Sequence, residues 1–63
     1  MEYPTPKQLK DAAQFAQRCK DTGCDLSREI TLAMRQLNKF KSERIRAGYQ
    51  AEIDALTSLI EAS

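Results

Sequence analysis

Histidine and tryptophan are absent from this 63-residue sequence, and glycine and proline occur only twice each. Without histidine, the chain lacks the side chain that most often serves as general base and as metal ligand. The two cysteines cannot complete a four-ligand zinc site within one chain. The sequence also lacks a nucleophile–base pair, a glycine-rich phosphate loop and a paired-carboxylate motif. We therefore predict a protein that is not an enzyme and that holds no metal and no cofactor.

Long apolar runs are also missing, because no stretch of 18 residues is free of polar side chains. The opening Met-Glu-Tyr-Pro is not the start of a signal peptide. Two cysteines without a secretory signal are typical of a reducing compartment, so we expect a cytoplasmic protein. At this length the chain forms one domain, 1–63, which buries too little surface to be comfortably stable without disulfides, metal or oligomerisation.

Charge is unevenly distributed, although the formal net charge is only +1. Residues 25–48 hold six basic and three acidic side chains, whereas 49–63 hold three acidic and no basic ones. This polarity along the chain is a stronger indication of partners than the total charge.

The first helix has a complete start signal and is predicted over about 6–22. Thr5 and Gln8 have the spacing of a capping box, and Pro6 occupies the first helical position, where its missing N–H costs nothing. Gly23 ends this helix in the left-handed conformation and would bring Cys24 onto Cys19. We interpret the two cysteines as reduced structural residues; a disulfide or half of a metal site are the alternatives.

A turn at 23–27 leads into a long helix predicted over about 28–61, with Ser27 as the preferred N-cap and Asp25 as its competitor. Its apolar residues form two stripes, the second rotated by about 120° from the first at ~100° per residue. Either the helix runs straight through, or it breaks near Ala47-Gly48. The absence of a capping residue at 47–50 favours the continuous helix. The first stripe is Ile30, Ala33, Met34, Leu37 and Phe40; the second is Ile45, Tyr49, Ile53, Leu56, Leu59 and Ile60.

The predicted fold class is therefore all-α: a helical hairpin in which the short helix packs antiparallel on the front of the long one. The rear stripe would lie bare in a monomer, and soluble monomers seldom show such a patch. We therefore predict a homodimer, preferably antiparallel, through the rear halves of the long helices. Its expected interface is Ile45, Tyr49, Ile53, Leu56 and Ile60.

A basic ridge runs along the other side of the long helix. Four side chains fall within about 40° of each other on the helical wheel at ~100° per residue, and Leu32 lies among them. The ridge is either an ordinary solvated face or a contact for nucleic acid phosphates. Leu32 is either a scattered surface leucine or part of a protein-binding surface. The ridge residues are Arg28, Arg35, Lys39 and Arg46.

Four features of the chain carry a resemblance: its opening Met-Glu-Tyr-Pro-Thr-Pro, its Cys19/Cys24 pair, its segment Ser-Arg-Glu-Ile-Thr-Leu-Ala-Met-Arg-Gln-Leu at 27–37, and its length. In these features the chain resembles the small early proteins encoded in the exonuclease-to-excisionase region of lambdoid bacteriophages. The resemblance implies a non-enzymatic protein of the host cytoplasm that binds a host protein and favours lytic growth. It transfers no site residues. The predicted function is thus a non-catalytic, homodimeric interaction protein that binds a host or phage protein. The alternative is a nucleic-acid-binding regulator that uses the basic ridge.

Overall fold

Three α-helices follow one another along the chain in the computed structural model, which describes residues 2–62. They are α1 (Pro6–Asp21), α2 (Leu26–Lys39) and α3 (Glu43–Ala62). The prediction of an all-α fold is confirmed. The two ends of the predicted domain, Met1 and Ser63, lie outside the described residues.

Helix α1 begins as its sequence predicts. The Thr5 hydroxyl accepts from the backbone N–H of Gln8 at 3.2 Å, and the Gln8 side chain accepts from the backbone N–H of Thr5 at 2.8 Å. This reciprocal capping box satisfies two N–H groups that the helix itself leaves without partners. The helix ends at Asp21, one residue before the predicted end, with Thr22 as its C-cap.

The turn between α1 and α2 is a Schellman motif. Gly23 has φ 76°, the Gly23 N–H donates to the Lys20 carbonyl at 3.2 Å, and the Cys24 N–H donates to the Cys19 carbonyl at 2.9 Å. Asp25 then caps α2, because its side chain accepts from the Arg28 N–H at 3.2 Å. The preference for Ser27 as N-cap was wrong. The earlier start places Leu26 within the helix, where it packs against the core.

The predicted long helix over 28–61 is not formed. The chain leaves helical geometry at Phe40, and α3 starts anew at Glu43, so the break lies several residues before the alternative site at Ala47-Gly48. Gly48 is an interior residue of α3. The new helix starts from Ser42, whose carbonyl accepts from the Arg46 N–H at 2.9 Å.

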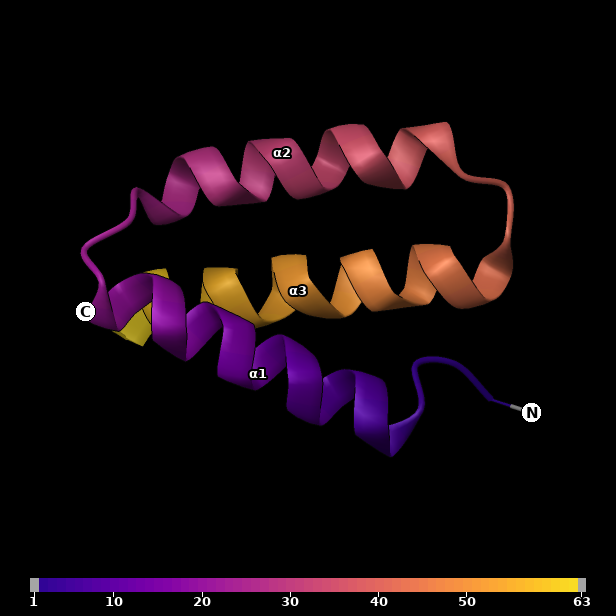
Figure 1. The fold of residues 1–63 in the computed structure, drawn as a ribbon, viewed down its shortest axis with the longest axis horizontal. Coiled ribbons are helices and arrows are strands. Elements are labelled where there is room, and N and C mark those ends of the chain that lie inside the picture. The colour runs from indigo at the N-terminus through magenta and orange to yellow at the C-terminus, as the bar shows by residue number, and fades with distance from the viewer. Residues whose placement is uncertain (1, 63) are drawn as a thin grey trace.

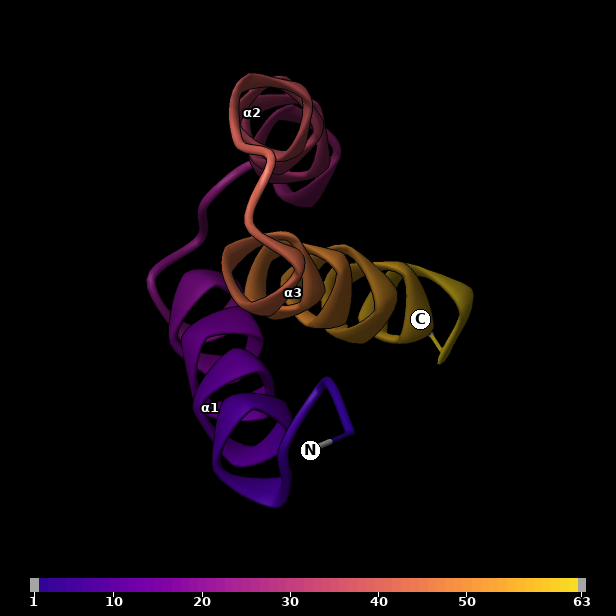
Figure 2. The ribbon, with the colours of Figure 1, turned by 90° about the vertical axis from the view of Figure 1, so that its right-hand side faces the viewer.

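Helix α3 lies between the other two helices and packs against both, whereas α1 and α2 make little contact with each other (Figures 1 and 2). Helices α1 and α3 run in roughly the same direction, and α2 runs in the opposite direction (Figure 1). The structure is therefore a three-helix arrangement and not the predicted two-helix hairpin. The rotation of the second apolar stripe has a simple cause: it belongs to a separate helix that faces two neighbours.

The core is centred on Leu56, which has no exposed surface and packs with Ala16 and Cys19. Ile53 is also buried. Two members of the predicted dimer interface thus lie inside the core of a single chain. Partly buried apolar residues surround this cluster: Phe15, Leu26, Ile30, Ala55 and Leu59.

Both cysteines are free thiols at the end of α1. Cys19 is buried, and Cys24 is exposed with its Sγ 3.2 Å from the Thr22 hydroxyl. Burial raises the pKa of the Cys19 thiol, and the neighbouring Cys24 adds to the rise. Such a thiol is chemically unreactive, in keeping with a structural role.

Candidate functional site

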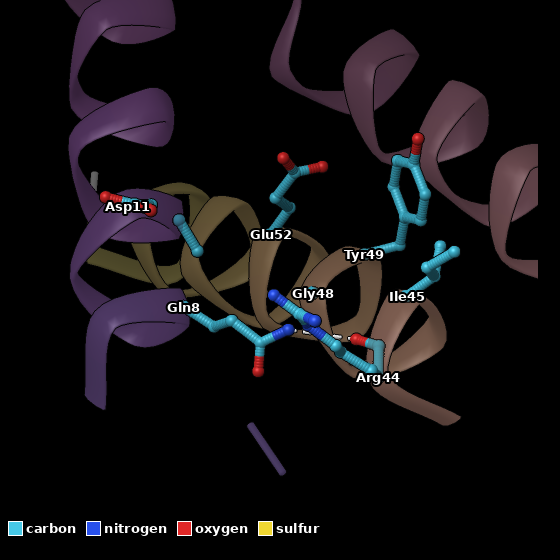
Figure 3. A pocket seen from close by; sticks show the side chains of 8 residues that line it. Gln8, Asp11, Arg44, Ile45, Gly48, Tyr49 and Glu52 are labelled. Atoms are coloured by element: carbon cyan, nitrogen blue, oxygen red, sulfur yellow. Dashed lines mark hydrogen bonds between the residues drawn. The ribbon is translucent and has the colours of Figure 1, made fainter. Parts of the chain in front are cut away.

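A groove opens along α3, because the two outer helices barely meet; its first part lies between α1 and α3, and its second part lies among all three helices. It consists of two neighbouring hollows of about 290 and 260 Å³ that share Tyr49 and Glu52. Figure 3 shows these two side chains rising from α3 toward the space between the outer helices. The first hollow is completed by Gln8, Asp11, Ala12, Arg44, Ile45 and Gly48, and the second by Phe15, Glu29, Leu32, Ala33 and Gln36.

One hydrogen bond closes the end of the groove near the start of α3. The Gln8 side-chain amide donates to the Arg44 carbonyl at 2.9 Å and thereby ties α1 to α3 (Figure 3). Gly48 lies beneath this bond, and a β-carbon added there would sit 3.5 Å from the Gln8 Nε2. This is an ordinary van der Waals distance, so alanine would also fit at this position beside Gln8. Gln8 therefore has two roles, since its Oε1 also completes the α1 cap.

An aromatic stack supports Tyr49, the ring that lines both hollows of the groove. The rings of Phe40 and Tyr49 lie 5.9 Å apart at an interplanar angle of 12°, within the favourable range for offset stacking. Phe40 is the first residue after α2 and Tyr49 lies in α3, so the stack fixes the position of the second turn relative to the groove. Tyr49 thus presents a rigid, half-buried ring to any molecule in the groove.

The groove is acidic. Asp11 comes from α1, Glu29 from α2 and Glu52 from α3. Partial burial, and next the negative charge of Glu29, raise the pKa of the Glu52 carboxyl. No basic side chain of the described residues lowers that pKa in return. Arg44 lines only the first hollow, at the end away from Glu29.

The predicted interface residues are divided by the structure. Ile53 and Leu56 are buried in the core and Tyr49 is half-buried in the groove wall. Ile45 and Ile60 remain 41% and 39% exposed, at opposite ends of α3. The structure therefore does not present these five residues as one continuous surface.

The basic ridge is shorter than predicted. Arg28, Arg35 and Lys39 are exposed on the outer face of α2, whereas Leu32, which is 39% exposed, lies at the edge of that face and lines the second hollow. Arg46 is not part of this face, because it belongs to α3. Its guanidinium donates to the Leu37 and Phe40 carbonyls at 2.8 and 3.2 Å and so caps the end of α2.

Sequence reasoning missed the groove and its carboxylates, Asp11, Glu29 and Glu52. The signal that could have revealed them is Ser42 followed by Glu43, a serine N-cap with an acidic residue in the first turn. A helix start at that position divides the chain into three helices and places Glu52 between the two apolar flanks of the last one.

Neither a membrane-spanning helix nor a group of metal ligands is present among residues 2–62. None of the helices described is long and apolar enough to cross a membrane. Within the same range, no three side chains among histidine, cysteine, aspartate and glutamate are grouped so that they could hold a metal ion.

No family model, curated protein or solved structure matches this chain. The functional assignment therefore rests on the groove and on the surface of α2.

Proposed function

We propose that the chain is a non-catalytic interaction module that binds a partner protein in the groove along α3. The observation that carries the proposal is the groove itself, in which Phe15, Ala33 and Tyr49 lie beside carboxylates. Protein interfaces combine an apolar centre with polar groups at its margin, and a groove between helices is a common seat for a partner helix.

The shape of the groove suits a protein partner, because it consists of two connected, open hollows of about 290 and 260 Å³ along α3 and not of one enclosed pocket. Each hollow suits one or two side chains of a partner. The resemblance to early proteins of lambdoid bacteriophages fits the same class of function, with a host or phage protein as the partner.

Affinity capture with a blocked groove tests the proposal. Gln36→Trp places a large ring in the second hollow, and Asn38→Trp adds the same ring to an exposed part of α2 outside the groove. We expect immobilised unmodified protein and the Asn38→Trp variant to retain one protein from a bacterial host lysate. The Gln36→Trp variant should lose it. Equal retention by all three, or none, contradicts the proposal.

The homodimer stays a prediction. Its main argument was a bare apolar stripe, yet α1 and α2 already cover Ile53 and Leu56. Light scattering at micromolar concentration measures the mass directly, and a mass of two chains supports the dimer while a mass of one contradicts it. Leu56→Asp places a charge in the core at a cost of several kcal/mol, so we expect it to unfold the chain and not merely to separate a dimer.

Nucleic acid binding is the second candidate, favoured by the exposed face that Arg28, Arg35 and Lys39 share. Three phosphate contacts would weaken binding about 40-fold between 50 and 200 mM salt. Fluorescence anisotropy with a labelled DNA duplex measures that dependence. If Arg35→Glu with Lys39→Glu leaves the affinity unchanged, this face is not responsible for the binding.

A further inference from the structure

Two carboxylates from different helices line the second hollow of the groove, and no basic side chain among residues 2–62 lines it with them. Glu52 of α3 and Glu29 of α2 both line the second hollow, and both are half-buried. The repulsion between them is strong enough to contribute to the raised pKa of Glu52. Asp11 of α1 adds a third carboxylate in the adjoining hollow, and only Arg44 at its far end offsets the charge.

Such an arrangement is unfavourable in the free protein. Partial burial removes water from the charged groups, and a neighbour of the same sign adds repulsion. A cation placed between the two carboxylates would relieve both effects and would gain from the lowered dielectric around it. The charges of the groove therefore specify a positively charged occupant.

The surroundings of the carboxylates specify the rest of the occupant. Phe15 of α1 and Ala33 of α2 face the same hollow as Glu29, and Tyr49 forms its wall. These apolar side chains line the same hollow as the two carboxylates. A segment that fills the groove must carry apolar side chains next to its cation, as successive residues on one face of a helix can do.

We propose that the occupant is a helical segment of a partner protein in which a lysine or arginine lies between two apolar side chains, the cation entering between Glu29 and Glu52. This inference rests on the proposed protein-binding function and names the chemistry of the partner. Nucleic acid does not suit this groove, since its phosphates would meet three carboxylates. A second copy of the chain in the groove would instead give a mass of two chains in solution.

Selection from a displayed library of helical peptides, with one face randomised, tests the inference on the unmodified protein. We expect the enriched peptides to carry one lysine or arginine flanked by apolar residues three or four positions away. A synthetic peptide of the enriched sequence is then compared with a copy in which norleucine replaces the basic residue. The affinity of the basic peptide should exceed that of the norleucine peptide at least about tenfold, as for other desolvated charge pairs.

Two double variants of the protein provide the matched comparison. Glu29→Gln with Glu52→Gln removes two charges from the groove, whereas Asp54→Asn with Glu61→Gln removes two exposed charges from elsewhere on α3. The first pair should weaken binding of the basic peptide by about tenfold or more, and the second should leave it within about twofold. Circular dichroism confirms that both variants remain helical.

Several outcomes overturn the inference: no enrichment, enriched peptides without a basic residue, or equal affinity for both double variants. The unmodified protein could also show a mass of two chains that Glu29→Gln with Glu52→Gln reduces to one and Asp54→Asn with Glu61→Gln does not. That result would assign the groove to a second copy and overturn the inference as well. A peptide that Gln36→Trp displaces but Glu29→Gln with Glu52→Gln does not would leave the protein-binding function standing. Only the cationic partner would then be excluded.

Discussion

The two turns of this molecule reverse the chain by different means. The first, between α1 and α2, is built from its own residues: Gly23 turns left-handed, backbone N–H groups close the end of α1, and Asp25 caps the next helix. The second, between α2 and α3, contains no glycine. Its closing group is the guanidinium of Arg46, which reaches back from α3 to two carbonyls at the end of α2.

The difference shows two ways of satisfying the last carbonyls of a helix. A Schellman motif uses the backbone and needs one residue with positive φ. An arginine cap uses a long side chain, so the backbone of the turn itself stays in ordinary conformations, as at Phe40 with φ −106° and ψ 142°. The first turn should be sensitive to backbone changes, and the second to the loss of one side chain.

The largest expected effect is at the second turn. Arg46→Ala removes both charge-assisted hydrogen bonds to Leu37 and Phe40, and we expect the free energy of unfolding to fall by about 2 kcal/mol. Urea denaturation followed by circular dichroism measures the change. Arg44→Ala is the control, because only the backbone carbonyl of Arg44 forms a hydrogen bond in the structure described. Equal losses in the two variants would show that Arg46 contributes only charge.

At the first turn, Gly23→Ala forces an alanine to adopt φ 76°. No atom lies within 4 Å of the added β-carbon, so the cost is purely conformational. We expect a loss of about 1.5 kcal/mol, the strain of an L-residue in the left-handed region. The same denaturation experiment on Gly48→Ala supplies the contrast, since Gly48 is helical and alanine there should be neutral or stabilising. A neutral Gly23→Ala would contradict the assignment of strain to this residue.

Asp25→Ala tests the other side of the first turn, where Asp25 is the N-cap of α2. It removes the side-chain acceptor of the Arg28 N–H, and an N-cap of this kind contributes about 1 kcal/mol. Ser27→Ala should have a smaller effect, because Ser27 lies inside α2 and is not its cap. Should Ser27→Ala prove the more harmful, the N-cap of α2 would lie where the sequence analysis placed it.

Glu52→Gln lies outside both turns and should change the free energy of unfolding least. The raised pKa means that the Glu52 carboxyl holds its proton more tightly in the folded state than a carboxyl with the ordinary pKa of 4.5 does. Stability from this group is therefore present below pH 4.5 and is lost as the pH rises through the raised pKa. We expect the free energy of unfolding of the variant to be slightly higher than that of the unmodified protein at pH 7, by a small amount because solvent screens this half-exposed group.

The pH dependence provides its check. Denaturation curves at pH 4 and pH 7 should show the advantage of Glu52→Gln shrinking toward the lower pH. Glu29 and Asp11 are carboxylates of the same groove, so Asp54→Asn is measured alongside as an exposed control. An advantage that is independent of pH would mean that burial of charge is not its cause.

Local signals explain which parts of the fold the sequence predicted. Thr5, Pro6, Gln8 and Gly23 act through neighbours within five residues, and each took the role that its position indicated. The break at Phe40 was missed because its main stabilising contact comes from Arg46, whose side chain was assigned to a solvent-facing ridge. A helix end that is capped from the following helix carries no glycine to mark it.

The candidate site was predicted less well than the fold. Arg28, Arg35 and Lys39 do share an exposed face, with Leu32 at its edge, because they lie within one helix and obey its periodicity. The groove depends on how two helices sit on a third. Glu29 and Glu52 are 23 positions apart in the sequence, and only the packing of α2 on α3 brings their charges together.

The central position of α3 has a consequence for how the chain acquires its shape. Helices α1 and α2, with 16 and 14 residues, are of a length at which isolated helices are marginal in water. They scarcely touch each other, so neither stabilises the other before α3 is present. A nascent chain emerging from the ribosome exposes both before α3 follows. The fold is thus expected to form in one cooperative step after synthesis of the third helix, with the first two remaining largely unstructured until then.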